Sequence, residues 1–414
     1  MRAPPCSSDP KKLFDASVLD DPHPFLSVVR REHPLSRVGD TGVHLVATWD
    51  GILEVLGREE DFSANLTGML IRGADGVPIP FDFPSLDGTQ VIATADEPHH
   101  TVHRRLVSPR FETDRVVDFE PMIREWTREA LAPFLLDEGG EFVPIAERIP
   151  AQVVGSLLGL PDGDAERHRA WAMMGGDMLA GEVGPTRMQA LALEGQKMGH
   201  YLKRHLEAAS KAAPDPSRAS LLELLAEGVR AGEITLSQAT GIGMVMFGAG
   251  GESTSALIGS AMRVLAEEPE LAEQLRQDPL QIARFVEEVV RLEPPFKFHY
   301  RAVRRECELQ GYTLGPGDRL MLLWAAANRD PAVFEEPDAL RLDRKHPKHH
   351  MSFGRGAHFC VGAPLARLEA RVMVEEVLRE TRQLSLVPGH PPVYAQSIFT
   401  RRLESLVVST RKIA

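Results

Sequence analysis

The stretch Met351-Ser-Phe-Gly-Arg-Gly-Ala-His-Phe-Cys360-Val-Gly-Ala-Pro-Leu-Ala-Arg-Leu-Glu369 sets one cysteine between a glycine-rich loop and a segment with helical periodicity. Gly354, Gly356 and Gly362 allow the backbone to bend and to approach a partner closely. Pro364 suits the first turn of a helix, where its missing N–H costs nothing. A thiolate just before a helix N-terminus is stabilised by the helix dipole and by free amide groups. The pattern predicts a thiolate that binds a metal from one side, against the alternative of a buried structural cysteine beside a tight turn.

The same stretch fits a longer pattern, Phe-x-x-Gly-x-x-x-Cys-x-Gly-x-x-x-Ala, at Phe353, Gly356, Cys360, Gly362 and Ala366. So many fixed positions rarely coincide by chance, and the segment resembles the haem-ligand loop of the cytochrome P450 family. The resemblance implies that Cys360 is the axial ligand of the iron of haem b (iron protoporphyrin IX). It also implies that Phe353 shields the sulfur and that His358 reaches a haem propionate. The cofactor-binding residues expected within this loop and helix are Phe353, Gly354, His358, Cys360, Gly362 and Ala366.

The composition leaves room for a large core and gives the chain a negative balance of charge. Of the 414 residues 43% are hydrophobic, and the formal net charge is −12. That balance argues against general nucleic-acid binding. The N-terminus has no secretory apolar region, no run of about 20 apolar residues could span a membrane, and the three cysteines form no CxxC pair. We expect a soluble, cytoplasmic, monomeric protein that binds neither nucleic acid nor membrane.

Helical periodicity dominates the chain from about residue 98, whereas strand-like segments are short. We expect a mainly α fold with a minor β-sheet, in one domain over 1–414 whose β-rich parts fall within 1–95 and 300–414. The resemblance places haem between a long kinked helix and the helix after the cysteine loop. Residues 62–95 are expected as a long loop and 213–217 as a surface connection. Helices are expected at 49–56, 98–110, 115–136, 147–158, 162–182, 185–211, 218–230, 236–267, 270–276, 279–292 and 364–381, and strands at 43–48, 301–303, 307–309, 319–323 and 392–409.

The helix expected at 236–267 carries a defect at its centre. Thr235-Leu-Ser-Gln238 forms a capping box at its start, and Pro269 ends it. Its middle reads Phe247-Gly-Ala-Gly-Gly-Glu-Ser-Thr-Ser255, and each glycine there weakens a helix by about 1 kcal/mol relative to alanine. Close approach of a flat ligand or a local kink explains the glycines. Tight packing against another helix explains them equally well when the segment is taken alone.

Within this defect, Ala249-Gly-Gly-Glu-Ser253 resembles the oxygen-activation segment of cytochromes P450, whose usual form is Ala/Gly-Gly-x-Asp/Glu-Thr. The resemblance makes Glu252 the acid and Ser253 the alcohol of proton delivery, with Ala249 beside the cofactor. A hydroxyl can hold water and bound oxygen in place, and a carboxylate can pass protons inward from solvent. Serine lacks the methyl group of threonine, so its rotamer is less restricted, which puts the coupling of the reaction in doubt. Thr254 can replace it only if the kink turns that side chain inward.

Three further constellations match the family. Glu288 and Arg291 share a helix face at i and i+3, and with Arg344 the resemblance makes them a buried network that serves folding and haem retention. His100 and Arg104 share another helix face, and the resemblance makes them propionate ligands together with Arg301. Residues that the resemblance places in the substrate pocket are Phe83, Gly250, Phe296, Phe298 and Ile398, while Lys297 and His299 either face away or read a substrate oxygen.

The resemblance implies a monooxygenase that hydroxylates or epoxidises a hydrophobic small molecule with O2 and two electrons. The chain leaves no tract for a flavin or iron–sulfur domain, so a ferredoxin and its NAD(P)H-dependent ferredoxin reductase are the expected electron donors. Four arginines form either a basic patch on which the ferredoxin docks or ordinary surface charges: Arg105, Arg110, Arg355 and Arg367. The alternatives are a peroxide-driven peroxygenase, an enzyme of carrier-bound substrates, and a non-catalytic haem or gas-binding protein.

Overall fold

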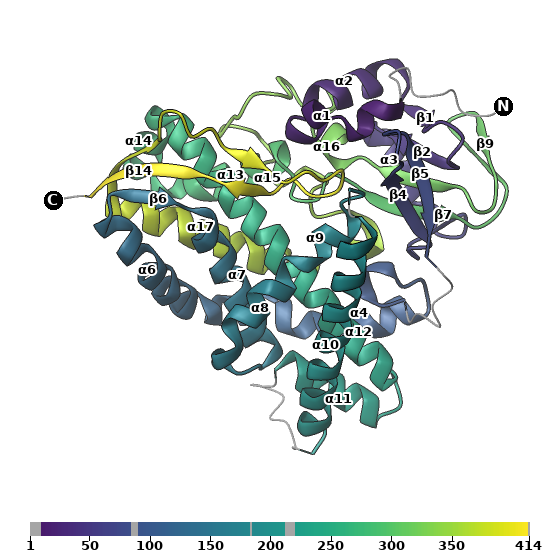
Figure 1. The fold of residues 1–414 in the computed structure, drawn as a ribbon, viewed down its shortest axis with the longest axis horizontal. Coiled ribbons are helices and arrows are strands. Elements are labelled where there is room, and N and C mark those ends of the chain that lie inside the picture. The colour runs from purple at the N-terminus through teal and green to yellow at the C-terminus, as the bar shows by residue number, and fades with distance from the viewer. Residues whose placement is uncertain (1–9, 84–89, 183, 212–219, 413–414) are drawn as a thin grey trace.

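Helices form most of the structure, a computed structural model that describes residues 10–83, 90–182, 184–211 and 220–412 (Figure 1). The α-helices are α1 Ala16–Asp20, α2 His23–Glu32, α3 Trp49–Leu56, α4 His99–Val107, α5 Thr113–Val116, α6 Glu120–Leu136, α7 Val143–Leu158, α8 Ala165–Ala172, α9 Met174–Leu179, α10 Pro185–Ala209, α11 Leu221–Arg230, α12 Leu236–Phe247, α13 Ser253–Glu267, α14 Pro269–Gln277, α15 Ile282–Leu292, α16 Trp324–Ala327 and α17 Ala363–Glu380. Short 3-10 segments are η1 Pro10–Phe14, η2 Ile92–Thr94, η3 Ser108–Phe111, η4 Val117–Phe119, η5 Asp162–Asp164, η7 Pro279–Gln281 and η8 Gly356–His358, and η6 Gly248–Glu252 is a π-helix.

The strands build small sheets at the periphery of the helices. They are β1 Leu35–Arg37, β2 Val43–Val46, β3 Phe62–Ser63, β4 Gly68–Arg72, β5 Pro78–Asp82, β6 Gly139–Glu141, β7 His299–Val303, β8 Cys307–Leu309, β9 Tyr312–Leu314, β10 Arg319–Leu322, β11 Thr381–Leu386, β12 Val393–Tyr394, β13 Leu403–Ser405 and β14 Val407–Lys412. Among the described residues the largest sheet has the order β1-β2-β10-β7-β3, with β2 and β10 parallel and the other pairs antiparallel. The expected mainly α fold with a minor sheet is confirmed.

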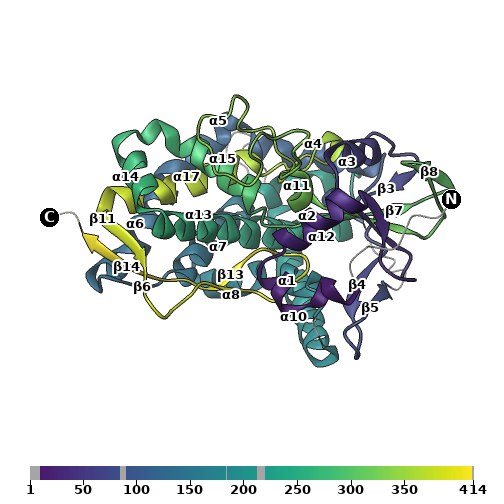
Figure 2. The ribbon, with the colours of Figure 1, turned by 90° about the horizontal axis from the view of Figure 1, so that it is seen from above.

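The long interrupted helix runs through the interior of the helical part, with the largest sheet at one end of the molecule (Figures 1 and 2). Thr235 caps α12 through a capping box with Gln238. The glycine-rich defect is η6, which joins α12 to α13 without a change in chain direction. A π-segment inside an α-helix is rare and often marks a functional site. The expected helix over 236–267 is therefore present, and its defect is a local change of hydrogen-bond pattern.

Two segments differ from the sequence-based expectation. The loop expected over 62–95 contains the hairpin β4–β5, because Met69 and Leu70 are fully buried and Leu70 donates its N–H to the hydroxyl of Tyr300 at 3.0 Å. The helix expected over 162–182 breaks into η5, α8 and α9. The break allows α9 to approach η6, since a Cβ added at Gly175 would lie 3.3 Å from the Cα of Gly248.

Two prolines near the N-terminus lie at the start of a helix. Prolines often interrupt secondary structure, but Pro22 is the N-cap of α2 and Pro24 lies in its first turn, where a missing N–H costs nothing. The connection expected at 213–217 lies outside the described residues. No helix within those described is long and apolar enough to cross a membrane.

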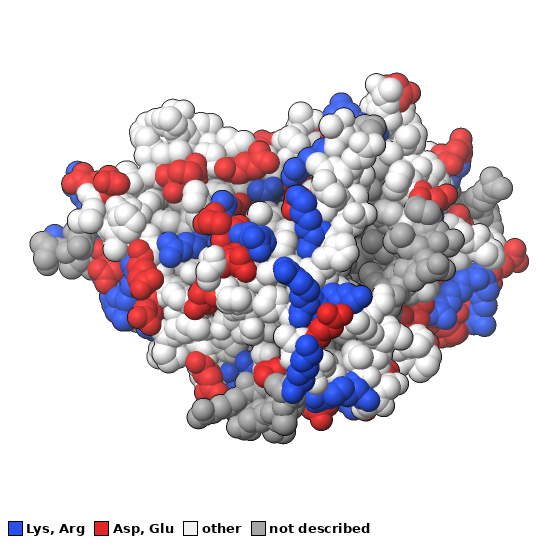
Figure 3. Space-filling model, turned by 60° about the horizontal axis from the view of Figure 1, so that its bottom comes forward, with Lys and Arg blue, Asp and Glu red and all other residues white. Residues whose placement is uncertain are grey.

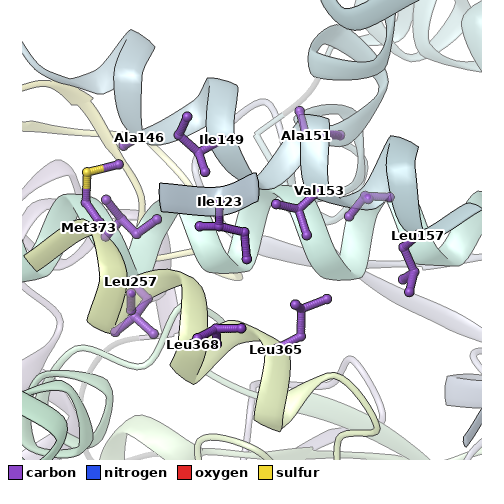
Figure 4. Close-up of a cluster of buried hydrophobic side chains, with 14 of the residues drawn as sticks. Ile123, Ala146, Ile149, Ala151, Val153, Leu157, Leu257, Leu365, Leu368 and Met373 are labelled. Atoms are coloured by element: carbon purple, nitrogen blue, oxygen red, sulfur yellow. The ribbon is translucent and has the colours of Figure 1, made fainter. Parts of the chain in front are cut away.

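The main core lies between α6, α7, α13 and α17. Ile123, Ile149, Val153, Leu257 and Leu365 point into it from these helices (Figure 4). Each is less than 5% exposed, and burying a side chain of this size contributes roughly 1.5–3 kcal/mol. This core fixes α13 against α17, and so fixes η6 relative to the cysteine loop that precedes α17.

A buried ionic network joins α15 to the segment that leads to the cysteine loop. Arg291 donates to both carboxylate oxygens of Glu288 at 2.8 and 2.9 Å, and Arg344 donates to Glu288 Oε2 at 2.8 Å. Arg291 also donates to the carbonyls of Asn328, Pro337 and Ala339. Burial opposes ionisation of Glu288, yet the bonds from Arg291 and Arg344 hold its pKa below the ordinary value.

We predict that Glu288→Gln lowers the free energy of unfolding by about 3–5 kcal/mol, because it leaves the buried Arg291 without its counter-charge. The measurement is chemical denaturation of the haem-loaded protein followed by far-UV circular dichroism. Glu335→Gln is the control, since Glu335 is 84% exposed and pairs with Arg341 at the surface; its effect should stay below about 1 kcal/mol. Equal effects of the two variants would contradict the structural role of the network.

Candidate active site

A mostly apolar cavity lies between η6 and the cysteine loop. Its volume is about 210 Å³. The loop contributes Phe353, Gly354, His358, Cys360 and Gly362, and α17 contributes Ala366. The opposite wall comes from Ala249, Gly250, Ser253 and Thr254. Segments about 100 residues apart in the sequence therefore face each other across one space.

The backbone of the loop presents the sulfur of Cys360. Gly354 and Gly356 have φ of +68° and +71°, a conformation that side chains other than glycine rarely adopt. The N–H of Cys360 donates to the carbonyl of Phe353 at 2.8 Å. Burial raises the pKa of the Cys360 thiol, while the N–H groups of Gly362 and Ala363 and the cations Arg104 and Arg367 act in the opposite direction. A metal ion that binds this sulfur therefore displaces a proton.

Glu287 anchors the loop at both of its ends. Its carboxylate accepts from Arg367 at 2.6 and 3.1 Å and lies 2.9 Å from Nε2 of His350. Burial favours the neutral acid, but His350 and Arg367 together bring the pKa of Glu287 to about 2. Arg367 also lies over the ring of Phe353, 4.4 Å from its centroid. These contacts fix the ring of Phe353 beside the cysteine.

Ser253 and Thr254 both border the cavity, so the π-segment turns two hydroxyl-bearing residues toward it. The hydroxyl of Ser253 donates to the carbonyl of Ala249 at 2.5 Å, within its own helix. The side chain of Thr254 is 3% exposed. The sequence left open whether Thr254 turns inward, and in the structure it does.

Glu252 lies on the other side of η6, away from the cavity. Its carboxylate accepts from the N–H of Gly176 at 2.6 Å and from Nε of Arg402 at 3.3 Å. A Cβ at Gly176 would lie 2.0 Å from Glu252 Oε1, so a larger residue there would displace the carboxylate from this position. Burial raises the pKa of Glu252 to about 7, although Arg402 and the Gly176 amide act to lower it. Glu252 can therefore gain or lose a proton near neutral pH.

Arg402 connects Glu252 with carboxylates nearer the surface. Its guanidinium lies 3.8 Å from Glu147, 3.8 Å from Asp177 and 4.0 Å from Glu404. Asp177 is 31% exposed and also pairs with Arg187 on α10. A chain of charged groups thus leads from the surface at α9 and α10 to the acid beside η6.

Cationic and imidazole groups gather at one edge of the cavity. His100, Arg104, Arg301, Arg355 and His358 line it. The guanidinium of Arg301 is buried and donates only to the carbonyl of Tyr300 among the described residues, and burial lowers its pKa to about 10. Nδ1 of His358 and Nε of Arg355 are buried without a hydrogen-bond partner. His100 lies 3.1 Å from Glu97 and Arg104 donates to the carbonyl of Phe359. Arg301, Arg355 and His358, in contrast, have no anionic acceptor among the described residues, which is costly for buried polar groups.

Three residues predicted for the substrate pocket lie elsewhere. Phe298 and Ile398 line a smaller cavity with Lys297, on the side of β7 away from the cysteine. Phe83 packs against the second hydrophobic cluster, beneath the largest sheet. These three residues do not line the main cavity. For Phe298 the reason is that strand side chains alternate between faces: His299 and Arg301 of β7 line the cavity, and Phe298, directly before His299, points to the other side. Gly250 and Phe296 do line the main cavity.

The four arginines considered for a docking patch are mostly engaged. Arg105 pairs with Glu233 at 2.8 Å, Arg367 with Glu287, and Arg355 lies over the ring of Trp49 at 4.8 Å. Arg110 lies over Phe119 at 5.5 Å. Phe359, next to Cys360, is 40% exposed. On the face seen in Figure 3, acidic and basic side chains lie side by side, so that they can form ion pairs with one another.

Comparisons with known proteins agree with this fold and site. The family model for cytochrome P450 matches residues 177–393. Cytochrome P450 144 of Mycobacterium tuberculosis is 38% identical over 409 residues, which are 98% of this chain and 92% of that protein. The erythromycin C-12 hydroxylase of Saccharopolyspora erythraea is 31% identical over 94% of this chain and 92% of its own. CYP108D1 of Novosphingobium aromaticivorans superposes with a TM-score of 0.84 at 24% identity, over 99% of this chain and 100% of that one.

The chain belongs to the cytochrome P450 family, and it is a haem-dependent monooxygenase. The residues of the cavity fit haem. Cys360 lines the space, and the unpartnered polar atoms of Arg355 and His358, together with the buried guanidinium of Arg301, are matched to the two carboxylates that haem carries. Bound there, haem supplies the activation of O2, favoured by electron donation from a thiolate.

Sequence reasoning missed several residues of this site. Glu287 had a signal, since a second carboxylate beside Glu288 on an apolar helix requires its own partners. Arg355 was expected at the surface but lines the cavity instead. Gly176 and Arg402 had no local signal, because their contacts with Glu252 span 76 and 150 residues.

We predict that the free energy of unfolding of Glu252→Gln increases relative to that of the wild type as pH rises. The raised pKa means that the folded wild type holds a proton more tightly than the unfolded chain between pH 4.5 and about 7. Its stability therefore falls across that window, by on the order of 3 kcal/mol at pH 8, and the variant lacks this loss. The measurement is the difference in unfolding free energy between variant and wild type at pH 5 and pH 8.

Glu404→Gln serves as the control for that experiment, because Glu404 lies near the same arginine but is 53% exposed. Its effect on the free energy of unfolding should stay below about 1 kcal/mol at either pH, as for an exposed ion pair. A pH-independent difference for Glu252→Gln would contradict the elevated pKa of the buried acid.

Proposed function

We propose that this monooxygenase hydroxylates or epoxidises a hydrophobic small molecule, with electrons from a ferredoxin and its NAD(P)H-dependent reductase. The observation that carries the proposal is the cavity above Cys360. Its wall includes Val245, Met246, Leu257, Val290 and Phe296. Apolar walls with few polar groups are typical of sites for hydrophobic small molecules. Two relatives are named as a vitamin D(3) 25-hydroxylase and an erythromycin C-12 hydroxylase, which supports hydroxylation as the reaction.

In this proposal each side of the cavity has one task. Cys360 provides the axial thiolate, shielded by Phe353. His100, Arg104, Arg301 and His358 hold the haem carboxylates, and the position of Arg355 supports its inclusion with them. Ala249 and Gly250 present backbone rather than bulky side chains to the cofactor. Buried donors and cations compensate the two carboxylates, which would otherwise be costly to bury.

Protons reach the cavity through Glu252 and a hydroxyl in this proposal. Asp177, Glu147 and Arg402 lead from the surface to Glu252, which can exchange a proton near neutral pH. The Ser253 hydroxyl, now bound to the carbonyl of Ala249, can exchange that acceptor for a water in the cavity. Rotation of Glu252 away from the Gly176 amide then completes the path. General acid catalysis of this kind contributes factors of about 10²–10⁴.

Electron donors would approach the face that carries Phe359. This side chain is exposed beside the thiolate, and its carbonyl accepts from Arg104 at 2.7 Å. An exposed aromatic residue with nearby arginines suits a transient interface with an acidic protein. Only part of the expected basic patch is available for this contact, because Arg105 and Arg367 are ion-paired.

The function is tested by reconstitution with a ferredoxin, a ferredoxin reductase, NADH and ¹⁸O2. Candidate substrates are first chosen by the spin-state shift of the haem spectrum, from steroids, macrolides, fatty acids and polar metabolites of matched size. The proposal expects shifts with the hydrophobic classes and one ¹⁸O atom in the product. Shifts with polar compounds alone would overturn the substrate class. Turnover with hydrogen peroxide but none with reduced ferredoxin would assign the chain to the peroxygenase alternative.

We predict that Ser253→Ala uncouples the reaction. Product formation should fall by about tenfold or more, while O2 consumption changes less and hydrogen peroxide release rises, because protons are no longer guided to the bound oxygen. The measurements are NADH oxidation, O2 uptake, peroxide and product in one assay. Thr254→Ala is run in parallel, since Thr254 borders the same cavity; if it uncouples and Ser253→Ala does not, Thr254 has the role.

A further inference from the structure

The sequence left open whether His299 faces away or reads a substrate oxygen, and the structure places it in the wall of the main cavity. It begins β7, and side chains two apart on a strand share a face, so His299 lies on the same face as Arg301. Both residues line the main cavity. Tyr300, between them, packs into the cluster on the opposite face. His299 therefore faces the space above the cysteine, unlike Lys297, whose ammonium donates to the carbonyl of Ser397 behind the wall.

One hydrogen bond fixes the tautomer of His299. The indole Nε1 of Trp324 lies 2.7 Å from Nδ1 of His299. An indole N–H can only donate, so Nδ1 must be the acceptor. In a neutral imidazole the other nitrogen then carries the hydrogen, and Nε2 is a donor. Burial, with a further contribution from Arg301, lowers the pKa of His299 to about 3, so the ring stays neutral at physiological pH.

The Nε2–H donor has no acceptor among the described residues. The neighbours of the ring are aromatic: the centroids of Phe296 and Phe399 each lie 5.6 Å away, and that of Trp324 lies 6.0 Å away. Phe296 and Phe399 also stack on each other at 4.7 Å. His299 is partly buried and lines the cavity, so a ligand there can reach this donor. A ligand that excludes water without supplying an acceptor leaves the donor unpaired, at a cost of about 1–3 kcal/mol.

We propose that His299 reads the substrate: the molecule oxidised here carries a neutral oxygen acceptor, such as a ketone, ester or hydroxyl group, which accepts a hydrogen bond from Nε2 of His299. This inference rests on the proposed hydrophobic substrate and adds that the substrate carries one oxygen acceptor at a fixed position. A donor held in one tautomer and one position fixes where the oxygen of a bound ligand must lie. It also discriminates against ligands that lack the oxygen, because they leave the donor unpaired.

A haem carboxylate is the other oxygen acceptor that could take this hydrogen bond. The cationic edge formed by His100, Arg104, Arg301, Arg355 and His358 already offers donors for it. The ring of His299, in contrast, lies among phenylalanines. The substrate is therefore the source we assign, and the experiment separates the two.

The probes are arylimidazoles, which bind through the haem iron and so need no knowledge of the substrate. The compounds are compared in pairs: one carries an acetyl group and the other the isosteric isopropenyl group, at the same ortho, meta or para position. The red shift of the Soret band of the holoenzyme on titration gives the Kd of each compound. We expect at least one acetyl compound to bind about fivefold more tightly than its isopropenyl partner in the wild type. His299→Phe should abolish that preference. His299→Gln should keep most of it, because glutamine retains an N–H donor. Trp324→Phe should reduce it, because the tautomer of His299 is then no longer fixed.

Haem retention supplies the second measurement. The rate of haem transfer from each variant to apomyoglobin should match the wild type for His299→Phe and rise for Arg301→Leu. No acetyl preference in the wild type, or a preference that His299→Phe leaves unchanged, would overturn the proposal. So would haem loss from His299→Phe as fast as from Arg301→Leu. Because azole binding requires only haem, these results do not depend on whether the ferredoxin-dependent reaction is reconstituted.

Discussion

Two adjacent buried carboxylates on α15 hold the parts of the site together. Glu288 binds Arg291 and Arg344, which fixes the segment before the cysteine loop, while Glu287 binds His350 and Arg367 on either side of the loop itself. Neighbouring carboxylates of like charge stay ionised in the core only because each is surrounded by donors. Removing a partner would leave a buried charge unpaired, which is far costlier than losing a surface ion pair. The position of the Cys360 sulfur depends on this arrangement.

The opposite wall depends on a defect rather than on regular structure. The π-segment η6 separates the functions of neighbouring residues: Ser253 and Thr254 face the cavity, and Glu252 faces Gly176 and Arg402. A regular α-helix would not place these groups in the same way, because one inserted residue rotates the following side chains around the axis. Both α8 and α9 approach η6 closely: a Cβ at Gly251 would lie 2.3 Å from the Cβ of Ala172, and a Cβ at Gly175 would lie 3.3 Å from the Cα of Gly248. The acid is therefore controlled by an element that is distant in sequence and adjacent in space.

The sequence predicted those features whose causes are local. The loop around Cys360 and the interrupted helix followed from glycines, a proline and a capping box within short segments. The direction of Phe298 did not, because side-chain parity depends on where β7 begins and on its pairing with β10. The hairpin β4–β5 was hidden because glycines and prolines mask its alternation, and tertiary burial of Met69 and Leu70 stabilises it. Contacts such as Gly176 with Glu252 arise only from the fold, so no local pattern could indicate them.

The central claim is that Cys360 binds the haem iron as a thiolate and that the rest of the site is arranged around this bond. The most direct measurement is the carbon monoxide difference spectrum of the reduced, haem-loaded protein. A strongly red-shifted Soret band, typical of cysteinate ligation, is the result that this account predicts. A band at the position typical of histidine-ligated haem would show that the sulfur is protonated or unbound, and would contradict it.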